Sequence, residues 1–276
     1  MRIFRLLLKS LLILVVLLFL VGLGYGLLHY KADLPLEVLK EKYEFEDSKY
    51  LELDGMQVHY RQVGQGPPLV LIHGYGGNLW NWEAWTEILQ DSFQVVTLDL
   101  PGFGFTGPRL DGDYSTAKYI DFLNRFFDQI GLDSFNLAGN SMGGSIAWQY
   151  ALRHPEETKK LILVNAAGYP RRMEKETPIG FKIPALPGAE QVITKVPPRS
   201  IMEKTVKGIY GNPEQVTAAG VDQFMDIMRR EGNRKALFDR RKADQGLGSE
   251  AIKNIIQRTL IIWGDQDRLI PEGVVN

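Results

Sequence analysis

The stretch that decides the fold is Phe135-Asn136-Leu137-Ala138-Gly139-Asn140-Ser141-Met142-Gly143-Gly144. We expect a strand over Phe135–Ala138 and a helix over Ser145–Arg153, with a sharp turn between them. The turn fits the pattern G-x-S-x-G, in which the serine hydroxyl is exposed and the glycines relieve the crowding. A glycine-rich turn with an incidental serine is the alternative, but the flanking strand and helix favour Ser141 as a nucleophile.

A second glycine-rich segment, His73-Gly74-Tyr75-Gly76-Gly77, follows the apolar run Leu69–Ile72. Glycines allow the backbone to approach a ligand closely. We expect the backbone N–H groups of Tyr75 and Met142 to stabilise an oxyanion beside Ser141. His73 stands at the end of the strand and is interpreted as a structural residue that fixes this loop. For the segment by itself, a plain strand-to-loop turn is the alternative.

An acidic loop, Trp263-Gly264-Asp265-Gln266-Asp267, follows the last apolar strand, Thr259–Trp263. A carboxylate in this position can orient a histidine and stabilise its charged form. From the residues alone, Asp265 and Asp267 compete for that role, and a solvated acidic loop is the alternative to both.

Between these motifs, short apolar strands alternate with segments of helical periodicity. This alternation predicts an α/β fold, with a mostly parallel sheet covered by helices on both faces and the chemistry at the carboxyl ends of the strands. Asp54-Gly55 predicts a hairpin turn near the start. The rhythm stops between Pro170 and about Gly248, where Asn212-Pro213 is typical of a helix start and predicts a helix to about Arg230. We interpret this region as a helical cap inserted late in the sheet.

Four segments resemble, in order and spacing, those of the α/β-hydrolase fold superfamily. The resemblance covers nearly everything from about Tyr50 to the end, and is strongest to bacterial esterase- and lipase-like members with an N-terminal anchor. The Gly-Asn-Ser-Met-Gly-Gly turn is also similar to that of carbon–carbon bond hydrolases. The segments are His73–Gly77, Asp99-Leu100-Pro101-Gly102-Phe103-Gly104, Gly139–Gly144 and Gly264-Asp265-Gln266-Asp267-Arg268-Leu269-Ile270-Pro271.

The resemblance implies a role for each matching residue. Ser141 matches the nucleophile, Asp267 the acid of the catalytic triad, and Tyr75 and Met142 the backbone oxyanion donors. The family's cap usually shapes the substrate pocket. Dehalogenases and epoxide hydrolases of this fold carry aspartate at the nucleophile position, so the chain does not resemble either.

The chain departs from the family at the catalytic histidine, which follows the acid by some tens of residues in the family. Here the sequence stops at Asn276, and its histidines are His29, His59, His73 and His154. None occupies the required place, and a serine hydroxyl is a poor nucleophile without a base. We therefore expect a fragment of a longer enzyme, which lacks the last strand and helix, has an exposed sheet edge and is inactive or nearly so.

The N-terminus differs in character from the rest. The apolar run Leu11–Leu28 follows Arg2, Arg5 and Lys9 and, as a helix, would be about 27 Å long, close to the thickness of a bilayer core. A cleaved signal peptide is the alternative, but its apolar region is usually shorter. The positive residues before the run favour a cytoplasmic N-terminus, so we expect a single-pass membrane protein with its catalytic domain outside the cytoplasm.

The composition excludes several other classes of function. A net charge of −1 gives no reason to expect a nucleic-acid partner, and the absence of cysteine excludes disulfides and thiolate metal sites. No cofactor or metal is implied, since neither H-E-x-x-H nor a phosphate-binding loop is present. The predicted segments are an anchor (1–30), a connector (31–48), the first part of the core (49–169), the cap (170–250) and the second part of the core (251–276).

The leading functional hypothesis is a serine hydrolase that cleaves a small-molecule carboxylic ester. Apolar residues at helical spacing in the cap, such as Met202, Val206 and Met225, are consistent with a lipophilic substrate, but a stripe that faces the core is the commoner reason for such a pattern. A carbon–carbon bond hydrolase of the same fold is one alternative. A non-catalytic, membrane-tethered binding protein that has lost its base is the other.

Overall fold

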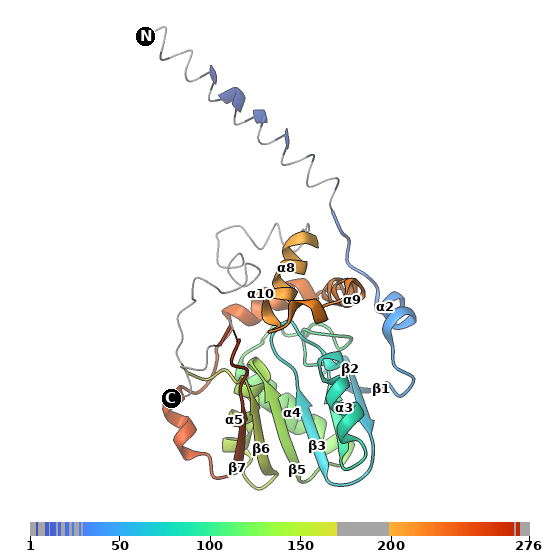
Figure 1. Ribbon diagram of the computed structural model, residues 1–276, viewed down its shortest axis with the longest axis vertical. Helices are drawn as coiled ribbons and strands as arrows, with labels where there is room; N and C mark the ends of the chain where they lie inside the picture. The colour runs from blue at the N-terminus through green and yellow to red at the C-terminus, as the bar shows by residue number, and fades with distance from the viewer. Residues whose placement is uncertain are drawn as a thin grey trace.

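The computed structural model describes residues 30–169, 199–267 and 269–270, with scattered positions before residue 30. A seven-stranded sheet forms the centre of this part of the chain, and helices α8, α9 and α10 lie together beyond one end of its strands (Figure 1). The N-terminal part of the chain reaches the sheet by passing beside α9 and then through α2 (Figure 1).

The sheet has the strand order β1-β2-β4-β3-β5-β6-β7. Strands β3 to β7 are parallel, whereas β1 and β2 form an antiparallel hairpin that joins the sheet through β4. The predicted α/β fold with a mostly parallel sheet is confirmed. The strands are β1 Lys49–Leu53, β2 Met56–Val63, β3 Pro68–Ile72, β4 Gln94–Leu98, β5 Phe135–Asn140, β6 Thr158–Val164 and β7 Arg258–Ile262.

Helices cover both faces of the sheet. Alternate residues of a strand point to opposite sides, so a strand that is apolar throughout presents apolar side chains on both faces, and both faces must be buried. On β3, Val70 and Ile72 pack into the large core beside α4 and α5, whereas Leu69 and Leu71 pack on the other face against Trp82. The helices are α2 Leu36–Tyr43, η1 Leu79–Trp82, α3 Glu83–Leu89, α4 Thr116–Ile130, α5 Met142–Arg153, α8 Arg199–Ile209, η3 Pro213–Gln215, α9 Ala218–Met228, α10 Asn233–Lys242 and η4 Ser249–Asn254.

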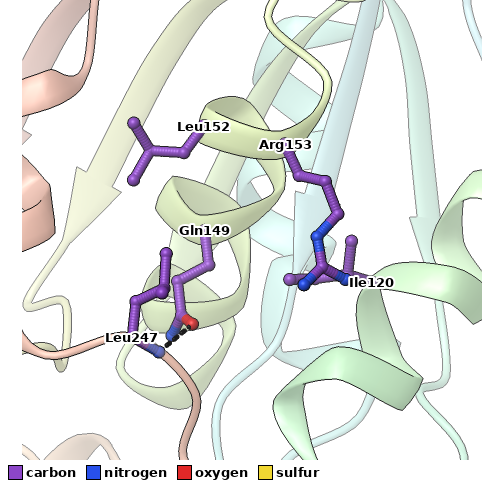
Figure 2. Close-up of a pocket in the computed structure, with 5 residues that line it drawn as sticks. All are labelled: Ile120, Gln149, Leu152, Arg153 and Leu247. Atoms are coloured by element: carbon purple, nitrogen blue, oxygen red, sulfur yellow. Dashed lines mark hydrogen bonds between the residues drawn. The ribbon is translucent and has the colours of Figure 1, made fainter.

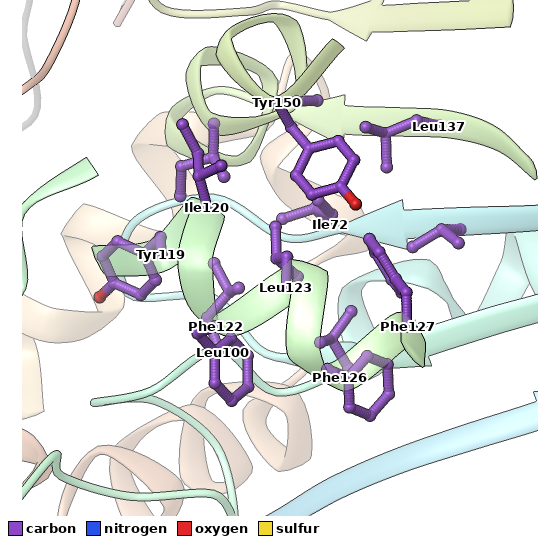
Figure 3. Close-up of a cluster of buried hydrophobic side chains, with 14 of the residues drawn as sticks. Ile72, Leu100, Tyr119, Ile120, Phe122, Leu123, Phe126, Phe127, Leu137 and Tyr150 are labelled. Atoms are coloured by element: carbon purple, nitrogen blue, oxygen red, sulfur yellow. The ribbon is translucent and has the colours of Figure 1, made fainter. Parts of the chain in front are cut away.

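The core between the sheet and α4 is built from aromatic side chains at helical spacing. Phe122, Phe126 and Phe127 are fully or almost fully buried (Figure 3). The ring centroids of Phe127 and Phe135 of β5 lie 4.4 Å apart. Gly131 ends α4 in the left-handed conformation, with φ of 72°. This packing fixes β5, and therefore the turn that follows it, against the rest of the sheet.

Residues 170–198 of the predicted cap lie outside the described residues, and the described part, 199–250, differs from the sequence prediction in one respect. The single helix expected from Asn212 to about Arg230 is wrong, because a short 3-10 turn ends at Gln215 and α9 begins afresh at Ala218. Thr217 caps this second start, since its hydroxyl accepts the N–H of Gly220 at 3.0 Å.

The connector contains a helix that the sequence analysis did not predict. Leu39 of α2 is completely buried in a small cluster with Phe105 of the core and Ile227 of α9. Upstream of α2, Leu34 pairs with the end of α9 through its backbone, and Asp33 accepts hydrogen bonds from the Arg234 guanidinium. The connector is therefore packed onto the cap helices as well as onto the core.

Two further expectations concern the ends of the chain. Within the described residues, no helix is both long and apolar enough to cross a membrane. Half of the predicted anchor, Leu11–Leu28, lies outside those residues. Among the described strands, β7 lies at one edge of the sheet, and all five of its residues are exposed.

Candidate active site

The turn between β5 and α5 has the strained backbone that a nucleophile elbow requires. Ser141 has φ of 52° and ψ of −117°, an unfavourable conformation for a residue with a side chain. A β-carbon at Gly139 would lie 2.3 Å from the carbonyl oxygen of Gly143, and one at Gly143 would lie 2.3 Å from that of Ile72. The glycines of the motif are therefore required by close backbone contacts.

Met142, the predicted oxyanion donor that follows Ser141, is the first residue of α5. The N–H groups in the first turn of a helix have no acceptor within the helix and lie at the positive end of its dipole. The Met142 N–H is thus placed where a helix stabilises negative charge. Its side chain is buried beside Arg240 of the cap, whose Nε lies 3.4 Å from the Met142 sulfur.

The loop after β3 lies directly against the nucleophile turn. A β-carbon at Gly74 would lie 3.1 Å from Cβ of Ser141 and 3.0 Å from Oδ1 of Asn140. Tyr75, the second predicted oxyanion donor, follows at once, so the structure brings it close to Ser141 in the fold. The Tyr75 hydroxyl donates to the carbonyl oxygen of Leu237 in α10 at 2.7 Å.

Helix α10 of the cap covers these loops. Besides its contacts with Tyr75 and Met142, Asn233 donates from Nδ2 to the carbonyl oxygen of Gly104 at 3.0 Å. A β-carbon at Gly102 would lie 3.0 Å from that of Ala236. The helix therefore touches the loops after β3 and β4 and the start of α5, which together surround the candidate site.

His73 has the structural role that the sequence predicted. Its Nε2 accepts the N–H of Leu100 at 3.0 Å, so its Nδ1 carries the proton and donates to the carbonyl oxygen of Gly74 at 2.8 Å. Complete burial lowers the pKa of His73, which keeps the ring neutral. The ring joins the loop after β3 to the loop after β4 and has no free nitrogen for catalysis.

Asp99 is a second buried anchor for the same loops. Its carboxylate accepts hydrogen bonds from Nδ1 of His59 at 2.7 Å, the N–H of Leu79 at 2.8 Å and the N–H of Phe105 at 2.7 Å. Burial alone would raise the pKa of Asp99, but the hydrogen bond from His59 and the backbone hydrogen bond from Phe105 oppose burial, and the pKa is lowered. The His59–Asp99 pair therefore holds three chain segments together beneath the site.

None of the histidines that the structure describes is free to act as a base for Ser141. His59 is held by Asp99 on one nitrogen and by the Ser48 hydroxyl on the other, at 2.8 Å. His154, at the far end of α5, stacks on Tyr150 and pairs with Glu157 at 3.2 Å. His29 lies outside the described residues. The three described histidines therefore do not occupy the place of the catalytic base, as the sequence analysis expected.

The candidate acid Asp267 is held by donors on both carboxylate oxygens. The N–H groups of Leu269 and Ile270 donate to Oδ1 at 2.6 and 2.8 Å, and the side-chain amide of Asn165 donates to Oδ2. Asn165 directly follows β6, and the sequence analysis did not single it out. The one signal in the sequence was its position directly after an apolar strand, because Ser141 and Asp267 also follow the carboxyl ends of strands.

A surface hollow of about 170 Å³ lies away from these residues. Its walls are formed by α4, α5 and the segment after α10, and the N–H of Leu247 donates to the side chain of Gln149 at 2.7 Å (Figure 2). It shares no residue with the candidate site, so we do not interpret it as a substrate pocket. The lining residues are Ile120, Gln149, Leu152, Arg153 and Leu247.

The described residues do not meet the requirements of a metal site. Among the described residues, no group of three or more histidine, aspartate or glutamate side chains is arranged to hold one.

The fold and the turn at Ser141 define the class of protein. Residues 67–276 match the family model of the α/β-hydrolase fold, and the chain belongs to this family.

Curated relatives within the family have different activities. The chain is 30% identical over 230 residues to the dihydrolipoyllysine-residue acetyltransferase component of the acetoin cleaving system of Cupriavidus necator, but spans only 58% of that protein. It is 27% identical to 2-hydroxymuconate semialdehyde hydrolase of a Pseudomonas species, where 79% of this chain aligns with 76% of the relative. It is also 27% identical to lipase 1 of Psychrobacter immobilis, with 86% and 74% aligned.

One solved structure is similar along almost the whole chain. It is a membrane phospholipase A described as a bacterial virulence factor, which is 25% identical and has a TM-score of 0.64. The similarity covers 97% of this chain and 86% of that one.

Proposed function

We propose that the protein is a serine hydrolase that cleaves carboxylic esters through an acyl-serine intermediate. The observation that carries the proposal is the strained turn at Ser141, packed against the glycine-rich loop of Tyr75. Ser141 Oγ attacks the ester carbonyl carbon, and the N–H groups of Tyr75 and Met142 stabilise the resulting oxyanion. The alcohol leaves with a proton, and water then attacks the acyl-serine to release the acid.

This chemistry needs a base, and we propose an imidazole oriented by Asp267. The base takes the serine proton and returns it to the leaving alcohol, while the carboxylate stabilises the charged ring. The described histidines are committed elsewhere, so the proposed imidazole comes from outside the described residues. Asp267 supports the proposal because its loop is hydrogen-bonded to the turn after β6, which also holds Ser141.

We propose a lipophilic ester as the substrate class. The similarity to a lipase and to a membrane phospholipase A supports this choice. Apolar side chains of the cap support it as well, since Met202, Val221 and Met225 form a separate apolar cluster between α8 and α9. A core-facing role is the other interpretation of that cluster.

A carbon–carbon bond hydrolase is the second candidate, because 2-hydroxymuconate semialdehyde hydrolase is among the relatives. A panel of p-nitrophenyl esters of increasing acyl length, assayed beside a vinylogous 1,5-diketone, separates the two. Turnover of the diketone with no ester turnover would replace the ester proposal.

Labelling by a fluorophosphonate probe tests the nucleophile in the full product of the gene. We expect Ser141 to be labelled, and Ser141→Ala to lose the label and to lower ester turnover by at least about 10⁴-fold. The exposed Ser92 provides a matched control, since Ser92→Ala should retain both properties. A wild-type protein that binds esters but is neither labelled nor active would instead be a non-catalytic binding protein.

We propose that Leu11–Leu28 tethers the protein to a membrane, with the hydrolase domain on the extracytoplasmic side. Its length and apolar character support this, as does similarity to a membrane phospholipase A along 97% of the chain. Sodium carbonate extraction of cell membranes tests the tether, which predicts retention of the protein in the pellet. Release into the supernatant would contradict the tether. An alkaline phosphatase fusion after Lys49 would show on which side of the membrane the hydrolase domain lies.

A further inference from the structure

The turn that follows β6 is hydrogen-bonded to both the candidate nucleophile and the candidate acid. The carbonyl oxygen of Val164 accepts the N–H of Ser141 at 3.1 Å, and the carbonyl oxygen of Ser141 accepts the N–H of Ala167 at 2.9 Å. Between them, Asn165 reaches the acid loop. Its Nδ2 donates to Oδ2 of Asp267, and its Oδ1 accepts the N–H of Gly264 at 3.4 Å.

We propose that Asn165 is a positioning residue that sets the carboxylate of Asp267 relative to Ser141. The inference rests on the proposed function, in which Asp267 orients the base. Asn165 is suited to the role because it lies in the segment Val164–Ala167, whose backbone is hydrogen-bonded to Ser141. The distance between Ser141 and Asp267 is therefore set within one short segment. Strand pairing between β6 and β7 alone places only the start of the acid loop.

The chemistry of the amide also fits this role. An acid that must stabilise a charged imidazole has to keep its negative charge, and a neutral amide donates a hydrogen bond without neutralising it. A lysine or arginine in the same position would form an ion pair with Asp267 and reduce that stabilisation. Asn165 and the two backbone N–H groups together fix the carboxylate and leave its charge available.

The backbone at residue 165 limits which side chains can make this contact. Asn165 has φ of 45°, and its N–H donates to the carbonyl oxygen of Ile262 at the end of β7, at 2.9 Å. Glycine and asparagine adopt this left-handed region most readily, and only asparagine of the two carries a donor. The substitution Asn165→Gly therefore keeps the backbone conformation and removes the amide alone.

Kinetics of the full gene product test the proposal. For Asn165→Gly we expect kcat to fall about tenfold with KM unchanged, because Asn165 acts through Asp267 and not on the substrate. Asn165→Asp places a second carboxylate beside Asp267, so the acidic limb of the kcat/KM profile should move to higher pH. Asp54→Gly, at a left-handed residue in the distant β1–β2 turn, should leave kcat and this limb unchanged.

A second measurement does not depend on turnover. Hydrogen exchange of the Leu269 and Ile270 amides should become faster in Asn165→Gly and stay unchanged in Asp54→Gly, since the amide secures the carboxylate that these groups bind. Wild-type kcat in Asn165→Gly, a loss that only matches the unfolded fraction, or unchanged exchange would overturn the proposal. If Ser141 of the wild type is not labelled by fluorophosphonate, the proposed function fails, and exchange alone then tests the placement.

Discussion

At the scale of single residues, the glycines around Ser141 are required by the space available. A β-carbon at Gly143 would lie 2.3 Å from the carbonyl oxygen of Ile72 and 2.4 Å from that of His73. Both neighbours are backbone atoms of β3 and its loop, which cannot rotate away as a flexible side chain would. The absence of a β-carbon at Gly143 therefore allows the end of β3 and the start of its loop to pack closely against the turn at Ser141.

We therefore predict that Gly143→Ala lowers the free energy of unfolding by at least about 2 kcal/mol. Gly248→Ala is the control, because a β-carbon there would meet no atom within 4 Å and its φ is −73°. Urea denaturation of the two variants measures the difference. Equal midpoints would mean that the strand and α5 can separate without cost.

At the scale of elements, the connector helix α2 joins the cap to the core. Leu39 is completely buried between Phe105 of the loop after β4 and Ile227 of α9. Lys42 and Tyr43 at the end of the same helix bind the Asp226 carboxylate at 3.1 and 3.0 Å. Exposed ion pairs contribute little, so the apolar contact accounts for most of the stabilisation.

We predict that Leu39→Ala destabilises the protein by about 2–5 kcal/mol, because it leaves a cavity in this junction. The neighbouring Val38 is 37% exposed, and Val38→Ala should cost less than about 1 kcal/mol. Urea denaturation again provides the measurement, and limited proteolysis reports whether α9 loosens first. A similar cost for both variants would show that α2 is not held by this contact.

At the scale of the whole molecule, buried ionisable groups link stability to pH. The pKa of His73 is lowered by burial, so the folded protein does not take up the proton that the unfolded chain binds below about pH 6.5. The stability contributed by His73 is thus complete above that pH and is lost as the pH falls. Asp99, whose pKa is also lowered, adds a loss in the same direction below about pH 4.

We predict that the free energy of unfolding decreases between pH 7.5 and pH 5, and that His73→Gln largely removes this dependence while lowering stability at pH 7.5. His154→Gln, at a partly exposed site, is the control and should retain it. Urea midpoints at four pH values measure the slope. A decrease that persists in His73→Gln would assign the proton uptake to another group.

Much of the fold and part of the candidate site could be predicted from local patterns. Apolar runs of four or five residues located β3, β5 and β7. The elbow motif located Ser141 between a strand and a helix, because the requirements of a tight turn are met by neighbouring residues. The wrong prediction of a single helix from Asn212 to about Arg230 also has a local cause. The caps at Asn212 and Thr217 lie five residues apart, and spacing alone does not say which one starts the longer helix.

The amino-acid sequence by itself determined the α/β class, the position of the strained turn at Ser141 and the structural character of His73. Only the tertiary structure decided that Asn165 binds Asp267, that His59 pairs with Asp99 and that α2 packs against α9. The physical reason is separation along the chain. These partners are 40 to almost 190 residues apart, and the contacts exist only after the sheet has brought strand ends and cap together.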